Sequence, residues 1–233
     1  LVRVLGSPTV TDYDPFLMLD AFDSTNPEDY TKGFPLHPHR GIETVTYLAE
    51  GEIEHEDSLG NKGVIKSGGC QWMTAGSGIM HQEMPKASPR MLGLQLWVNM
   101  AAKDKMAQPK YRDIHPEQIT HVKEEGVEVR VLSGEYCGHK GGMQADYVPV
   151  TFLDVYLDAG AAWTVETDPA HTVFVYVLEG GCSDAEDNPV PARNAVLLTE
   201  GAKFTLNGGA ANSRLVFVAG KPLREPVPRG GPM

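Results

Sequence analysis

The sequence predicts an all-β protein built from two similar β units in tandem. Three observations carry this prediction. Short apolar runs with strand-like alternation recur along the 233 residues, 25 glycines and 17 prolines punctuate them, and one stretch of strand pattern occurs twice. Many short strands separated by turn signals are typical of a sandwich or a barrel.

The individual strands follow from alternation and from β-branched residues. In the first half we expect strands over residues 43–48, 52–58, 63–66, 71–75 and 92–99. The sequence Leu-Gly-Asn-Lys-Gly at residues 59–63 has the composition of a hairpin loop. Helical periodicity is weak, so we expect only short helical segments, at residues 101–106 and near residues 115–118.

An internal repeat relates residues 44–51 to residues 173–180. The first copy, Thr-Val-Thr-Tyr-Leu-Ala-Glu-Gly, resembles the second, Val-Phe-Val-Tyr-Val-Leu-Glu-Gly, and Tyr47 matches Tyr176. A second match relates residues 73–76 to residues 198–201. The chain is therefore expected to contain one β unit twice.

A polar, proline-bearing segment at residues 101–123 is the natural connection between the two units. We place the boundary near residue 118, which divides the chain into domains 1–118 and 119–233.

Two pairs with i, i+2 spacing are the strongest functional signal: His37 with His39, and His81 with Glu83. On a strand this spacing puts both side chains on one face, so two adjacent strands can aim three imidazoles and one carboxylate at one point. These donors suit iron, copper, nickel or zinc. In the second copy the matching positions carry Glu166, Asp168, Leu206 and Gly208. The ligand set is therefore expected in the first unit alone.

Charge and cysteine usage exclude several classes of protein. The formal charge is −11 and basic residues do not cluster, which argues against direct binding to nucleic acid. No apolar run reaches the length of a membrane helix, and no signal peptide is visible. The three cysteines are far apart and match neither a disulfide framework nor a Cys-X-X-Cys metal pattern, so we expect a reducing, cytoplasmic location.

Long segments of the chain resemble the pirin family. They are residues 37–47, 71–85 and 94–99, with shorter matches at residues 14–20 and 220–226. The resemblance implies a bicupin: two tandem cupin (jelly-roll) β-barrels with short connecting helices, of which only the N-terminal one holds a metal. Residues 230–233 depart from the family, whose members continue into a further segment.

The resemblance also implies roles for individual residues. The metal ligands would be His37, His39, His81 and Glu83. The general cupin motif has a glutamate where Glu43 stands, and strand parity would turn it toward the same interior unless Gly41 introduces a bulge. We therefore expect Glu43 to support the site from outside the ligand set. Apolar residues near the motif are expected to form a pocket: Met73 and Ile79, with Met80 and Trp72.

The function implied by the resemblance is cleavage of a flavonol such as quercetin with O2 and release of carbon monoxide. Glu83 would be the catalytic residue that accepts the proton of the substrate hydroxyl. The cofactor would be one divalent transition metal. We expect Fe(II), with Cu, Ni, Mn, Co and Zn as the alternatives.

Two alternatives use the same site. One is an iron-containing, redox-responsive regulatory protein that binds a transcription factor or metabolic enzyme as its protein partner. The other is a cupin with different chemistry, such as an isomerisation. The resemblance further implies a monomer. The remaining histidines are expected to have ordinary structural roles: His55, His115, His121, His139 and His171.

Overall fold

The structure is a computed structural model that describes residues 1–10 and 12–228, so the departure from the family at residues 230–233 lies outside it. Within these ranges the chain is almost entirely β, as the sequence predicts. Two short 3-10 helices interrupt the strands, η1 (Pro27–Asp29) and η2 (Pro116–Gln118). Every described helix is too short to span a lipid bilayer.

The first half of the chain forms a six-stranded and a four-stranded sheet. The six-stranded sheet has the order β1 (Val2–Leu5), β2 (Phe16–Ser24), β9 (Met91–Asn99), β4 (Ile42–Glu50), β7 (Cys70–Thr74) and β10 (Lys110–Ile114). The four-stranded sheet has the order β3 (Phe34–His39), β8 (Ile79–Pro85), β5 (Glu52–Asp57) and β6 (Lys62–Lys66).

The second half repeats this arrangement. Its six-stranded sheet has the order β11 (Thr120–Glu124), β12 (Val127–Ser133), β15 (Val150–Leu157), β22 (Ser213–Gly220), β17 (Thr172–Glu179) and β20 (Ala195–Leu197). Its four-stranded sheet has the order β16 (Ala162–Glu166), β21 (Lys203–Gly208), β18 (Gly181–Asp184) and β19 (Pro189–Pro191). A small hairpin, β13 (Glu135–Tyr136) with β14 (His139–Lys140), accompanies them.

The repeat seen in the sequence corresponds to equivalent places in the two halves. β4 and β17 carry the two copies of the repeated segment, and each lies between equivalent neighbours, β9 and β7 or β22 and β20. The result is two tandem jelly-roll units, which confirms the predicted bicupin class. The boundary near residue 118 stays a prediction; β10 belongs to the first set of sheets and β11 to the second.

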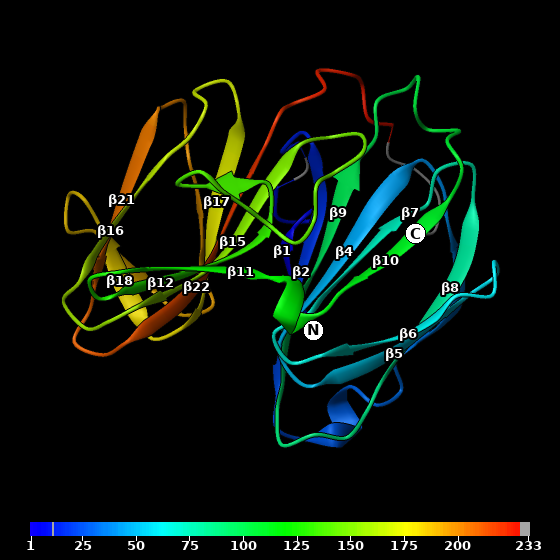
Figure 1. Cartoon of the computed structure of the whole chain (residues 1–233), viewed down its shortest axis with the longest axis horizontal. Helices are drawn as coiled ribbons and strands as arrows, with labels where there is room; N and C mark the ends of the chain where they lie inside the picture. Colours follow the sequence, from blue (N-terminus) through cyan, green and yellow to red (C-terminus); the bar gives the residue numbers. More distant parts are fainter. Residues whose placement is uncertain (11, 229–233) are drawn as a thin grey trace.

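The two six-stranded sheets face each other at the centre of the molecule (Figure 1). One apolar cluster spans both sheets. It contains Val45, Trp72 and Leu94 from the first half together with Phe152, Phe174 and Val216 from the second. β4 is therefore buried on both faces, because one face lines its own unit and the other meets the second unit.

A buried polar group also joins the halves. Asp154 lies between Arg214, whose Nε is 3.0 Å from Oδ1, and Arg130, whose Nη1 is 3.2 Å from Oδ2. The Tyr47 hydroxyl of the first half donates to the Asp154 carboxylate, and Arg130 donates to the Gly68 carbonyl at 2.6 Å. The charges of Asp154, Arg130 and Arg214 are therefore paired with one another, as buried ions require.

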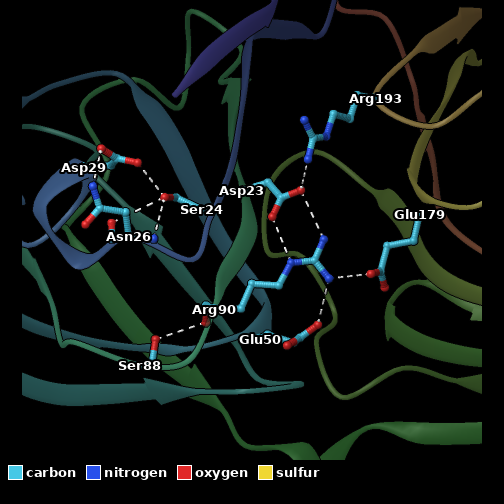
Figure 2. A network of polar contacts seen from close by, with 9 residues as sticks. All are labelled: Asp23, Ser24, Asn26, Asp29, Glu50, Ser88, Arg90, Glu179 and Arg193. Carbon is cyan, nitrogen blue, oxygen red and sulfur yellow. Dashed lines mark hydrogen bonds and ion pairs between the residues drawn. The ribbon is translucent and has the colours of Figure 1, made fainter.

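A second polar network bridges the halves nearer the surface (Figure 2). Arg90 makes a bidentate pair with Asp23, at 2.8 and 3.0 Å, and also contacts Glu50 and Glu179. Arg193 of the second half pairs with the same Asp23 at 2.7 Å. These partly exposed pairs supplement the apolar interface, since such pairs individually contribute little free energy.

The expected strands of the first half are confirmed with ends that shift by one or two residues, and η2 confirms the helical segment near residues 115–118. The helix expected at residues 101–106 is wrong, because that segment forms successive turns. Lys105 donates its ammonium to Asn99 Oδ1 and to the Gly41 carbonyl, which anchors the turns to β9 and to the start of β4. A segment this short does not offset the cost of helix nucleation.

Candidate metal centre

The two predicted pairs lie on neighbouring antiparallel strands. β3 pairs with β8, and His37 stands directly opposite His81. Burial along β8 alternates, so that Ile79, His81 and Glu83 are buried while Met80 is exposed. The i, i+2 spacing therefore directs the side chains of both predicted pairs into the interior of the first jelly-roll unit, as strand geometry requires.

Three imidazoles converge at this point. The Nε2 atoms of His37 and His39 are 3.0 Å apart, and those of His37 and His81 are 3.1 Å apart. His37 Nδ1 lies 2.7 Å from the Pro35 carbonyl, which requires a proton on Nδ1 and leaves the Nε2 lone pair directed at the other rings. His81 is buried, whereas His37 and His39 are half-buried, so the cluster is accessible from one side.

Two of the three histidines, His39 and His81, are held in their neutral form. Burial lowers the pKa of His39 to about 4 and that of His81 to about 2, and the neighbouring imidazoles add to both effects. Neutral imidazole is the form that binds a metal ion. The three nitrogen donors also lie within 4.8 Å of one another, which suits one ion. The residues present therefore fit a metal.

Glu83 lies on the same face of β8, and its carboxylate is hydrogen-bonded to a threonine of the six-stranded sheet. The Thr46 hydroxyl donates to Glu83 Oε1 at 2.7 Å and lies 3.1 Å from Gln95 Oε1. Burial raises the pKa of Glu83 to about 7, against the lowering effect of the hydrogen bond from Thr46. The structure thus brings the three predicted histidines together. The predicted carboxylate, that of Glu83, is hydrogen-bonded to Thr46 on β4 of the six-stranded sheet.

Glu43 lies on the opposite face of β4 from Thr46. Its Oε1 accepts a hydrogen bond from Thr74 Oγ1 at 2.6 Å, in the layer where Trp72 packs between the two halves. Burial raises its pKa. Gly41, at φ +69°, turns the chain from the four-stranded sheet into the six-stranded one, so strand parity does not carry over from His39 to Glu43. The exception that we allowed at Gly41 therefore applies, and Glu43 faces the contact between the two halves.

The expected pocket residues divide between the two faces of the sheet. Met73 and Ile79 are buried and form a small apolar cluster with Ala75 and Ile42. Trp72 belongs instead to the core between the halves. Alternation along β7 explains this division, since residues 71, 73 and 75 face the interior of the first unit.

Sequence reasoning missed several neighbours of the histidines. The ring of Trp97 meets His39 edge-on with centroids 5.0 Å apart. His55, which we expected to be ordinary, is buried with its ring 5.3 Å from His81 and stacks on Tyr111. The alternation of residues 52–58 already directs His55 inward, but no local pattern identifies its partners, because Tyr111 lies on a distant strand.

Comparisons with known proteins identify the family. The model of the pirin family matches residues 1–98, and that of the pirin C-terminal cupin domain matches residues 152–233. The chain is 44% identical over 240 residues to the Pseudomonas aeruginosa protein named "Putative quercetin 2,3-dioxygenase PA3240", covering 100% of this chain and 84% of that protein.

Two further relatives are similarly complete. Human pirin is 41% identical over 235 residues, which cover 99% of this chain and 79% of pirin. The solved structure of quercetin 2,3-dioxygenase from Acinetobacter baumannii superposes with a TM-score of 0.87 at 34% identity, covering 99% of this chain and 83% of that one.

Proposed function

We propose, from the premise that this chain belongs to the pirin family, that it is a metal-dependent dioxygenase acting on flavonol-like aromatic compounds. The observation that carries the proposal is the convergence of three imidazoles in the first jelly-roll unit. Relatives named for quercetin 2,3-dioxygenase support the choice of reaction and substrate class.

The proposed ligands are His37, His39 and His81, with Glu83 as the fourth. Two nitrogen ligands about 2.1 Å from one ion and at right angles around it are roughly 3.0 Å apart. The Nε2 separations of 3.0 and 3.1 Å agree with this spacing. Glu83 shares the inward face of β8 with His81, which supports its inclusion.

We propose Fe(II) as the ion, although Cu, Ni, Mn, Co and Zn accept the same donors. Bound there, the metal would supply Lewis acidity and coordination positions for substrate and O2. His37 is oriented for this role by its hydrogen bond to the Pro35 carbonyl, which fixes the ring and its tautomer.

Glu83 is the proposed proton acceptor. A flavonol must lose the proton of its enolic hydroxyl before it reacts with O2, and a buried carboxylate beside the metal is a group that can accept it. The hydrogen bond from Thr46 holds Oε1, which leaves Oε2 available to the metal and to the proton of the substrate. Thr46 acts through Glu83 and is a positioning residue.

The half-buried side of the cluster is the proposed substrate entrance. His37 and His39 are accessible there, and Ile79 stands opposite His39 across the pair of strands. We propose that Ile79 and Met73 form an apolar wall for the aromatic rings of the substrate, excluding water from the site.

The test combines metal analysis with an oxygen-dependent assay. The full chain is loaded with Fe(II) without oxygen, and quercetin and O2 are then added. We expect loss of the flavonol absorbance together with carbon monoxide release. His81→Ala should abolish both metal binding and turnover, and the matched exposed control His139→Ala should leave both unchanged.

Two results would contradict the proposal. Turnover that survives His81→Ala refutes the site. Stoichiometric metal binding without flavonol loss refutes the dioxygenase activity, and it would favour a regulatory metal protein instead.

A further inference from the structure

The second jelly-roll unit contains a cavity of about 490 Å³. Its inner lining is apolar and buried, and includes Leu153, Val165 and Phe217. Its rim is polar and exposed, and includes Glu166 and Asp168. This volume lies in the range of sites that hold small organic ligands.

The position of the cavity follows from the strand registers of the repeat. Thr44 pairs with Trp97 on β4 and β9, and Val173 pairs with Ala219 on β17 and β22. Thr44 and Val173 begin the two copies of the repeat, so Ala219 occupies the place of Trp97. In the first unit the Trp97 ring fills this place and contacts His39. Ala219 lines the cavity because its methyl group leaves that space open.

The deeper interior of the second unit is filled by apolar side chains. Trp163 stands opposite Leu206 across β16 and β21, and both are buried. The Trp163 indole donates to the Tyr136 hydroxyl at 3.0 Å and meets the Phe217 ring edge-on at 5.8 Å. Two members of this aromatic group, Tyr136 and Phe217, line the cavity.

The rim of the cavity carries a net negative charge. Three carboxylates, those of Glu135, Glu166 and Asp168, line it together with one ammonium, that of Lys203. Glu166 stands opposite Lys203 across β16 and β21, and His171 lies 3.9 Å from Asp168. An excess of carboxylates at the mouth of an apolar cavity attracts cations and repels anions.

We propose that this cavity binds a small amine with an apolar ring body, at a site separate from the histidine cluster. The ring would lie against the side chains of Tyr136 and Phe217, where burial of apolar surface favours it. The ammonium group would face Glu166 and Asp168 at the rim. The buried apolar lining of the cavity favours a ligand with an apolar ring, and the carboxylates at the rim favour a ligand with a positively charged head group.

The test compares three probes that share one ring system and differ in charge. Binding of 2-naphthylmethylamine, neutral 2-naphthylmethanol and anionic 2-naphthoate to the full chain is measured by calorimetry. We expect the amine to bind about five-fold more tightly than the alcohol, as two exposed charge contacts allow, and the carboxylate to bind most weakly.

Variants locate the binding. Glu166→Gln with Asp168→Asn should remove the advantage of the amine and leave the affinity for the alcohol unchanged. The exposed control Glu186→Gln should alter neither affinity. Ala219→Trp installs the residue of the first unit and should block all three probes, and Ala219→Met is the milder alternative if the tryptophan variant fails to fold.

Three results would overturn the proposal. They are the absence of saturable binding by any probe, equal affinity for amine and alcohol, and amine binding that is lost in His81→Ala but retained in a folded Ala219 variant. The last result would place the amine in the first unit.

Discussion

Replacing Thr46 with valine tests how the buried carboxylate of Glu83 is held. Valine has nearly the shape of threonine but lacks the hydroxyl that donates to Glu83 Oε1 at 2.7 Å. Both side chains are at most 2% exposed, so water does not replace the lost donor. Leaving a buried acceptor without its partner costs about 1–3 kcal/mol.

The expected loss of stability depends on pH in a defined direction. The pKa of Glu83 in the folded protein, about 7, is above its ordinary value, so the folded state binds the extra proton and ionisation at higher pH destabilises it. The Thr46 hydroxyl favours the ionised form. Its removal should therefore cost more at pH 8, where Glu83 is largely ionised, than at pH 6.

The measurement is thermal unfolding of the metal-free protein at both pH values. A loss of about 2 kcal/mol lowers the unfolding temperature of a chain of this size by about 4–8 °C. Thr120→Val, which removes an exposed hydroxyl, is the control and should have little effect at either pH. Equal losses at pH 6 and pH 8, or no loss at all, would refute the reasoning.

Three further predictions concern the metal, the histidines and the contact between the halves. Chelation should lower the unfolding temperature of the metal-loaded protein, because the ion binds the folded state, and His81→Ala should show no such effect. Without metal, the protein should lose stability relative to a His39→Gln variant as the pH decreases from about 6.5 toward 4, because the histidine gains a proton in the unfolded state while the low pKa of folded His39 keeps it neutral; parallel urea-midpoint profiles for the two proteins would contradict this. Tyr47→Phe removes the hydroxyl that donates to Asp154 and should cost about 1–2 kcal/mol in urea unfolding, whereas an unchanged midpoint would mean that this contact does not stabilise the interface.

Much of the candidate site could be predicted from local sequence pattern. Alternation is a property of neighbouring residues, and it directs His37 and His39 to one face of β3 and His81 to the same interior from β8. Glu43 shows where this reasoning stops. The turn at Gly41 moves the chain from one sheet into another. The alternation of side chains along β3 therefore does not predict which way the side chains of β4 point.

The connection between the two units illustrates the same limit. Composition predicted a local helix at residues 101–106, but a side-chain contact from Lys105 to Asn99 and to the Gly41 carbonyl holds that segment in turns. The partner groups lie on other elements, so a reading of the segment alone does not reveal them.

The sequence by itself determined the β class, the duplication and the histidine pairs, because each depends on residues close together in the chain. Only the tertiary structure decided which buried groups meet across strands. Thr46 reaches Glu83, Trp97 contacts His39, and Ala219 leaves a cavity where its counterpart fills the space. These contacts join residues that are far apart in sequence, and their register is set by pairing of whole strands. Side-chain identity at one position does not encode what stands opposite to it.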